Sequence, residues 1–122
     1  MTEEIIMTFG ARTIVLPVTD LAAAKAVWTE LLGVAPVQDQ PYYVGYETPG
    51  QHIGLDPNGH RDGMTAYWHV DDLAGTLDRL VKAGATEVAR PKDVGGGRLI
   101  ATVKDPAGNL IGLLQPGPEE RS

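Results

Sequence analysis

The chain has 122 residues, a net charge of −6 and no cysteine. The length fits one domain, and the negative charge argues against nucleic acid or an anionic membrane surface as partner, because both need a basic face. The absence of cysteine excludes a disulfide framework, a thiolate metal site and a cysteine nucleophile. No apolar run reaches membrane-spanning length and the first residues are acidic, so we expect a soluble, cytoplasmic protein.

The first half of the chain predicts one strand, one helix and three further strands. A β-branched run at 12–18 predicts the first strand, and Asp20 and Gly33 are typical of the two ends of a helix. The apolar face of this helix is expected to comprise Leu21, Ala24, Val27, Trp28, Leu31 and Leu32. The three short strands that follow are expected at 34–38, 42–47 and 52–55.

The second half predicts the same order of elements. A strand at 65–70 leads to a helix that begins after Asp72 and ends at Gly84. Its buried stripe is expected to comprise Leu73, Leu77, Leu80 and Val81. Further strands are expected at 86–91, 98–103 and 109–115, with a flexible hairpin tip at 94–98 and a loose tail at 116–122.

The two halves also share an Asp-Leu-Ala sequence before the helix, at 20–22 and at 72–74. A repeat at this spacing indicates one unit used twice, with a cleft between the copies. We therefore expect two βαβββ modules, at 11–56 and 64–115, joined by a linker at 57–63.

Several short motifs occur in a characteristic order. They are Val70-Asp71-Asp72-Leu73 before the second helix, Leu32-Gly33 and Ala83-Gly84 after the two helices, and the run Asp-Pro-Ala-Gly-Asn-Leu-Ile-Gly-Leu at 105–113. The chain thereby resembles the vicinal oxygen chelate superfamily over residues 11–115. That group contains glyoxalase I, extradiol dioxygenases and bleomycin-resistance proteins. The resemblance implies an α+β fold in which tandem modules form a concave, partly open mixed β-sheet with helices on the outside.

The resemblance also implies four positions at which metal-dependent members hold a divalent ion. In this chain they are occupied by Thr13, Gly54, Thr65 and Gly112. Glycine offers no side-chain ligand, and neutral threonine is a poor one beside histidine or carboxylate. We therefore expect no metal and no other cofactor. Either the cleft has been enlarged for a ligand, which we favour, or it is vestigial.

Strand alternation predicts which side chains line the concave face. The side chains expected to pack beneath the helices are Ile14, Leu16, Val18, Ala66, Trp68 and Val70. Alternation does not assign Tyr42, Tyr43 and Tyr46 to the cavity or to the core. The expected ligand-binding residues are Thr13, Val15, Pro17, His52, Gly54, Thr65, Tyr67, His69, Leu110, Gly112 and Leu114. This mainly apolar lining favours a partly apolar or aromatic small molecule, held by a few polar groups.

Two classes of function fit this pattern. The first is a non-catalytic small-molecule binder similar to the bleomycin-resistance branch, for which the resemblance implies a homodimer whose modules pair within one chain or across two. The second is a lyase, isomerase or dioxygenase with a relocated site. There His52, His69, Glu47 or Asp56 would bind an ion, or His69 would act as a metal-free general base. Replacing His69 should abolish turnover in an enzyme and only weaken affinity in a binder. An interaction module without a small-molecule role is the third possibility.

Overall fold

The computed structural model describes residues 8–58 and 63–121 and confirms an α+β fold with the predicted order of elements. Within the described residues, no helix is long and apolar enough to cross a membrane. The elements in chain order are β1 (Ala11–Pro17), α1 (Leu21–Leu32), β2 (Gln38–Gln40), β3 (Tyr43–Thr48), β4 (Gln51–Asp56), β5 (Thr65–His69), α2 (Leu73–Lys82), β6 (Thr86–Asp93), β7 (Leu99–Lys104), β8 (Leu110–Gln115) and the 3₁₀ helix η1 (Pro118–Arg121).

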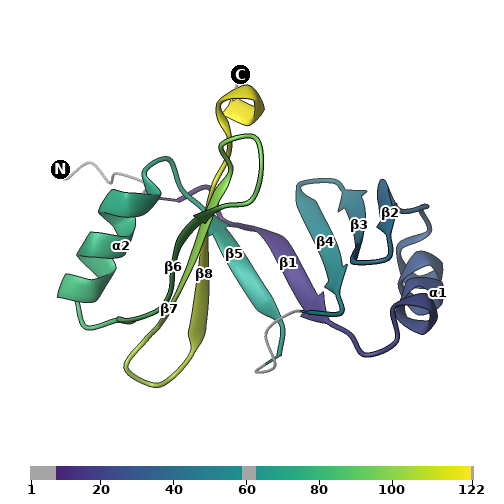
Figure 1. Ribbon diagram of the computed structural model, residues 1–122, viewed down its shortest axis with the longest axis horizontal. Helices are drawn as coiled ribbons and strands as arrows, with labels where there is room; N and C mark the ends of the chain where they lie inside the picture. Colours follow the sequence, from purple (N-terminus) through teal and green to yellow (C-terminus); the bar gives the residue numbers. More distant parts are fainter. Residues whose placement is uncertain (1–7, 59–62, 122) are drawn as a thin grey trace, which may run out of the picture. The chain divides into compact units, whose positions relative to one another are not determined.

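The chain divides into two compact units, one within residues 11–66 and the other formed by residues 67–121 with 8–10 (Figure 1). Most of the predicted linker, 57–63, lies outside the described residues, so the predicted module boundaries stay a prediction. Each unit contains both parallel and antiparallel strand pairs, and its strands do not close into a barrel. One helix packs against one face of these strands. The two units are therefore described separately.

The first unit has the strand order β2-β3-β4-β1, in which β1 and β4 run parallel and the other pairs run antiparallel. Helix α1 begins after Asp20, whose carboxylate accepts a hydrogen bond from the backbone of Ala23 at 3.0 Å, and ends at Gly33 in the left-handed conformation. The helix lies on β3 and β4. The core between them contains Val44, Tyr46, Ile53 and Leu55, with Ile14, Leu16, Val18, Leu21, Ala24, Trp28 and Leu32 packed around it.

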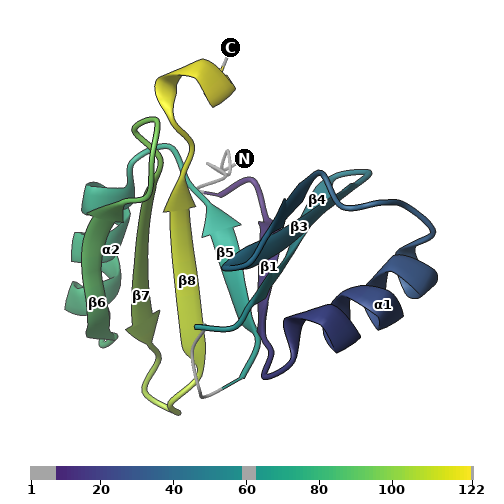
Figure 2. The same ribbon diagram turned by 45° about the vertical axis from the view of Figure 1, so that its right-hand side comes forward.

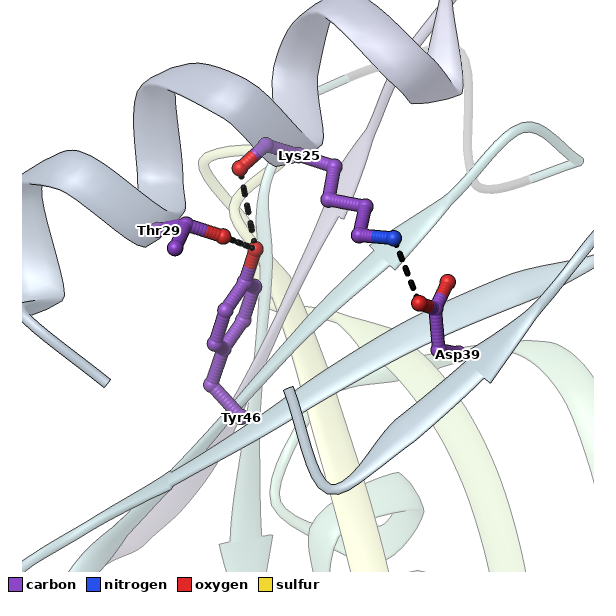
Figure 3. Close-up of polar contacts among 4 residues, drawn as sticks. All are labelled: Lys25, Thr29, Asp39 and Tyr46. Atoms are coloured by element: carbon purple, nitrogen blue, oxygen red, sulfur yellow. Dashed lines mark hydrogen bonds and ion pairs between the residues drawn. The ribbon is translucent and has the colours of Figure 1, made fainter. Parts of the chain in front are cut away.

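Polar contacts also fasten α1 to the strands beneath it (Figure 3). The hydroxyl of Tyr46, which is completely buried, donates to the backbone carbonyl of Lys25 at 3.1 Å and lies 2.7 Å from the hydroxyl of Thr29. The Lys25 ammonium pairs with Asp39 on β2. Tyr46 therefore belongs to the face that α1 covers, and its neighbours on β3 point to the other face.

The second unit, which includes β5 from Tyr67 onward, has the strand order β5-β8-β7-β6, and these strands lie side by side in Figure 2. Helix α2 begins after Asp72, which accepts from the backbone of Gly75 at 3.0 Å. Gln115 on β8 accepts from the backbone of Leu73 at 2.9 Å, so two side chains satisfy the first turn of the helix. The buried core consists of Val70, Leu73, Leu77, Ala101, Val103 and Leu113.

Some predicted packing is wrong because each helix covers only part of its strands. Val27 and Leu31 of α1 are 65% and 69% exposed, and Val81 of α2 is 44% exposed. Trp68 was expected beneath a helix but is 41% exposed. It lies on β5, whereas α2 packs on β6, β7 and β8, so the helix does not reach it.

Two predicted segments also differ. The strand expected at 34–38 is displaced to Gln38–Gln40, because Pro36 cannot donate to a strand ladder. The tail expected to be loose forms η1 over Pro118–Arg121. Gly117, which precedes it, is buried against the Gly96 backbone; a Cβ on Gly117 would stand 3.2 Å from the Gly96 carbonyl carbon. The glycine-rich hairpin tip is thus packed against the tail.

Candidate functional site

The face of each unit that its helix does not cover, called here the helix-free face, contains most of the predicted site residues. In the first unit Tyr43, Gly45 and Glu47 of β3 alternate with Val44 and Tyr46, which belong to the core beneath α1. Strand register arranges the residues of this face in two rows that run across the neighbouring strands. One row is Glu47, His52 and Thr13, and the other is Gly45, Gly54 and Val15.

The second row contains two glycines directly opposite each other, and the ring of Tyr43 covers them. A Cβ on Gly54 would stand 2.6 Å from Cζ of Tyr43, with the Tyr43 hydroxyl closer still. A Cβ on Gly45 would meet the Tyr43 ring at 3.0 Å and the His52 ring at 2.9 Å. The two glycines therefore leave space that the rings of Tyr43 and His52 occupy.

Tyr43, His52 and Glu47 form a continuous chain of hydrogen bonds on this face. The Tyr43 hydroxyl oxygen lies 2.7 Å from Nε2 of His52, and Nδ1 of His52 lies 2.5 Å from Oε1 of Glu47. The Tyr43 and His52 rings are nearly parallel, with an interplanar angle of 7°. The His52 side chain is 12% exposed and that of Glu47 is 57% exposed, so the chain connects a partly buried ring to a carboxylate in contact with water.

The second unit presents a different row on its helix-free face. Register places Tyr67 of β5, Gly112 of β8 and Thr102 of β7 side by side. Tyr67 is 7% exposed and Thr102 is 2% exposed. The Thr102 hydroxyl has no hydrogen-bond partner among the described residues. A buried hydroxyl without a partner is uncommon in folded proteins, so this group is a candidate for contact with a ligand.

His69 and Leu114 continue the same face one register step along. The backbone of His69 is held by the segment before β1. Its N–H donates to the carbonyl of Gly10 at 2.9 Å, and its carbonyl accepts from Phe9 at 2.9 Å and from the Thr8 hydroxyl at 2.8 Å. These bonds fix the position of the residue that we predicted as the candidate catalytic base, and that role stays a prediction.

Strand register places the remaining predicted site residues within each unit. Thr13, Val15 and Pro17 lie along β1 beside His52, Gly54 and Asp56 of β4. In the second unit, Leu110 of β8 lies opposite Lys104 of β7. Thr65 at the start of β5 is 2% exposed and Thr13 is 4% exposed.

The four positions of the implied metal site do not fit a divalent ion. Thr13, Gly54, Thr65 and Gly112 are all buried and supply two hydroxyls and no charge. At Gly54, the space in which a ligand side chain would begin is taken by Tyr43. Within residues 8–58 and 63–121, no three histidine, aspartate or glutamate side chains are grouped closely enough to hold a metal. A relocated ion at His52 and Glu47 would therefore lack a third such ligand in this part of the chain.

Comparison with known proteins gives the family. The model described as the Glyoxalase/Bleomycin resistance protein/Dioxygenase superfamily matches residues 10–113. The chain belongs to this superfamily. The resemblance predicted from the short motifs is thereby confirmed.

Two relatives illustrate this membership of the glyoxalase superfamily. A Vibrio parahaemolyticus protein named "Probable lactoylglutathione lyase" is 34% identical over 118 residues, which cover 82% of this chain and 86% of that protein. The glyoxylase-named protein CFP32 of Mycobacterium tuberculosis is 31% identical over 62 residues. The match covers 48% of this chain and spans about a quarter (24%) of the length of CFP32.

A solved structure extends the likeness of this superfamily member to nearly its whole length. Methylmalonyl-CoA epimerase from Mycobacterium tuberculosis superimposes with a TM-score of 0.76 over 98% of this chain and 96% of its own, at 19% identity. At that level of identity the likeness supports the fold. The choice among superfamily activities has to come from the residues of this chain.

Sequence reasoning missed two side chains that the structure singles out. The sequence did not assign Tyr43, one of three clustered tyrosines, to either face of its strand. The pairing of β3 with β4 puts the Tyr43 ring over Gly54. Thr102 carried no signal of its own. Its significance comes from the register that places it opposite Gly112, one of the implied metal positions.

Proposed function

We propose that this glyoxalase-superfamily member is a small-molecule-binding protein. It holds a partly apolar or aromatic ligand on the helix-free faces and uses no metal at the superfamily's usual positions. The observation that carries this proposal is the buried Thr102 hydroxyl, which has no partner among the described residues and lies opposite Gly112.

The energetics of this hydroxyl favour a ligand with a hydrogen-bond acceptor. Leaving a buried donor unsatisfied costs about 1–3 kcal/mol, and a ligand that accepts from it recovers that cost on binding. Gly112 contributes no side chain beside it, and Tyr67 on the next strand offers an aromatic ring. Stacking on such a ring adds about 1 kcal/mol beyond the burial of area. A carbonyl attached to an aromatic ring combines both features.

We also propose that the protein acts as a cytoplasmic homodimer. Val27 and Leu31 leave an apolar strip of α1 exposed, and exposed apolar surface of this kind is typical of contact with another chain. The negative net charge and the absence of cysteine are consistent with a cytoplasmic location.

The test uses acetophenone, an aromatic ketone, and ethylbenzene, which has a similar shape and no acceptor. Titration of ¹⁵N-labelled protein should shift the amide signals of Thr102 and Gly112, with acetophenone binding about fivefold more tightly, which corresponds to about 1 kcal/mol. Thr102→Val should abolish this preference, and Thr102→Ser should keep it. Equal affinity of wild type for both compounds, or shifts confined to other residues, would contradict the proposal.

A second candidate function is lyase or isomerase chemistry without a metal, and one observation favours it. The Glu47–His52–Tyr43 chain has the carboxylate–histidine–hydroxyl order by which proteins activate a hydroxyl. An assay for lactoylglutathione formation, prompted by the name of the Vibrio parahaemolyticus relative, should compare wild type with Tyr43→Phe and His69→Ala. Turnover lost in Tyr43→Phe would support this candidate, whereas no turnover in wild type would contradict lyase activity of that type.

A further inference from the structure

The helix-free face of the second unit is bordered by β6, the edge strand of the order β5-β8-β7-β6 (Figure 2). On β6, Ala89 lies opposite Thr102 of β7. Three residues further along, Lys92 lies opposite Ile100, so three steps along β6 match two steps along β7. An extra residue of this kind re-aims the side chains that follow it. In an unbroken ladder Pro91 would lie opposite Ile100, so the register shift is what brings Lys92 onto the face that contains Thr102.

Lys92 is a diagonal neighbour of Thr102, whose buried hydroxyl has no partner among the described residues. Diagonal neighbours on antiparallel strands lie about 7–8 Å apart, which is within reach of a long side chain. Lys92 is exposed at the edge of the unit, and no ion pair within residues 8–58 and 63–121 involves it. One ligand group can therefore contact the Thr102 hydroxyl on its buried side and the Lys92 ammonium on its exposed side.

The acidic side chains of β6 belong to the opposite face. Register pairs Glu87 with Val103 and Asp93 with Leu99. Val103 is part of the core beneath α2, and Leu99 packs against that core. Among the described residues that register places on the helix-free face of this unit, none is an aspartate or a glutamate. The face therefore favours a negatively charged ligand group, although the whole chain has a net charge of −6.

We propose that the ligand bound beside Thr102 is an aromatic carboxylate. One carboxylate oxygen accepts the hydrogen bond of the Thr102 hydroxyl, and the other faces the ammonium group of Lys92. This inference rests on the proposed function, because it takes the Thr102 hydroxyl as a ligand contact. A hydrogen bond to a charged acceptor is about twice as strong as one between neutral groups. Since Lys92 lies at the exposed edge, the carboxylate keeps contact with water on that side and avoids the cost of full desolvation.

The test compares benzoate with acetophenone, which has a similar shape and a carbonyl but no charge. Titration of ¹⁵N-labelled wild type at pH 7 and low salt should show benzoate binding about threefold more tightly. Lys92→Met should lose this preference and keep its affinity for acetophenone, whereas Lys92→Arg should keep both. Lys82→Met is the matched control, because it makes the same change of net charge at a side chain on α2 that is 76% exposed. It should behave as wild type.

Salt provides a second measurement that needs no variant. The benzoate preference of wild type should disappear at 1 M salt, where charges are screened beyond about 3 Å. A preference that survives 1 M salt, or that persists in Lys92→Met, would overturn the role of Lys92. Equal or weaker binding of benzoate, with both compounds shifting the amides of Thr102 and Gly112, would overturn the carboxylate and leave ligand binding intact. An absence of shifts at these amides with either compound would contradict the proposed function, and this inference with it.

Discussion

The ring of Tyr43 lies across the backbone of Gly54, with Cζ 2.6 Å from the point that a Cβ on Gly54 would occupy. Gly54 is one of the four positions at which metal-dependent relatives are expected to hold their ion. In this chain, the same place contains a phenol ring joined to His52 and Glu47. The implied metal-ligand position is therefore the floor of a hydrogen-bonded side-chain cluster.

Gly54→Ala should destabilise the protein because its methyl group would overlap the Tyr43 ring. Insertion of a methyl group into a packed site of this kind costs about 1–3 kcal/mol. Denaturant unfolding of Gly54→Ala, Tyr43→Ala and the double variant forms a cycle that isolates the contact. We expect the double variant to be more stable than the sum of the single changes predicts. Strict additivity would show that Tyr43 does not lie over Gly54.

Thr102→Val should raise stability and weaken binding at the same time. The substitution replaces an unsatisfied buried hydroxyl with a methyl group of similar size, so we expect the free energy of unfolding to rise by about 1 kcal/mol. Denaturant unfolding measures the gain, and the acetophenone titration measures the loss. Thr102→Ser keeps the hydroxyl and is the control for affinity. A fall in stability with Thr102→Val would show that the hydroxyl has a partner within the protein.

Tyr46→Phe should loosen α1 from the strands of the first unit. It removes the hydroxyl that bonds to the carbonyl of Lys25 and to the hydroxyl of Thr29, so we expect a loss of about 1–2 kcal/mol. Tyr42→Phe makes the same chemical change at an exposed position and should alter stability by less than about 0.5 kcal/mol. Thermal and denaturant unfolding of the pair check this difference, and equal effects would refute it.

Asp105 should contribute to stability in a defined range of pH. Its carboxylate accepts hydrogen bonds from the side chain and backbone of Asn109 at 2.8 Å and from the backbone of Ala107 at 2.9 Å. Chiefly because of the Asn109 side chain, its pKa lies below the ordinary value of 3.8. The folded-state pKa is the lower one, so the contribution is complete above the unfolded-state pKa and disappears as pH falls through the folded-state pKa.

An NMR titration of the Asp105 carboxyl carbon gives the folded-state pKa directly. Asp105→Asn should make the free energy of unfolding less dependent on pH in the acid range, because the carboxyl group that titrates there is absent. A wild-type midpoint at or above 3.8 would contradict the assignment of these hydrogen bonds.

The sequence predicted the fold well because its signals are local. Asp20 and Asp72 cap their helices as predicted, and the β-α-β-β-β order appears twice. Packing beyond the local pattern was harder to foresee. Leu31 fits the apolar period of its helix, yet it is 69% exposed because α1 contacts the strands through a narrower stripe.

The candidate site was less predictable because it depends on register between strands. Alternation indicates which residues of one strand share a face, but it does not show which residue of the next strand lies opposite. Tyr43 becomes informative only when Gly45 pairs with Gly54, and Thr102 only when it pairs with Gly112. Both relationships join residues on separate strands, so neither was visible in the pattern of a single strand.

We propose above that this superfamily member binds an organic small molecule without a metal at the usual positions. Native mass spectrometry of protein purified without added metal or chelator measures bound ions, bound organic molecules and oligomer mass together. We expect a dimer that carries no stoichiometric divalent ion and gains the mass of acetophenone when that ketone is added. One divalent ion per chain, retained on dilution and needed for acetophenone to bind, would contradict it.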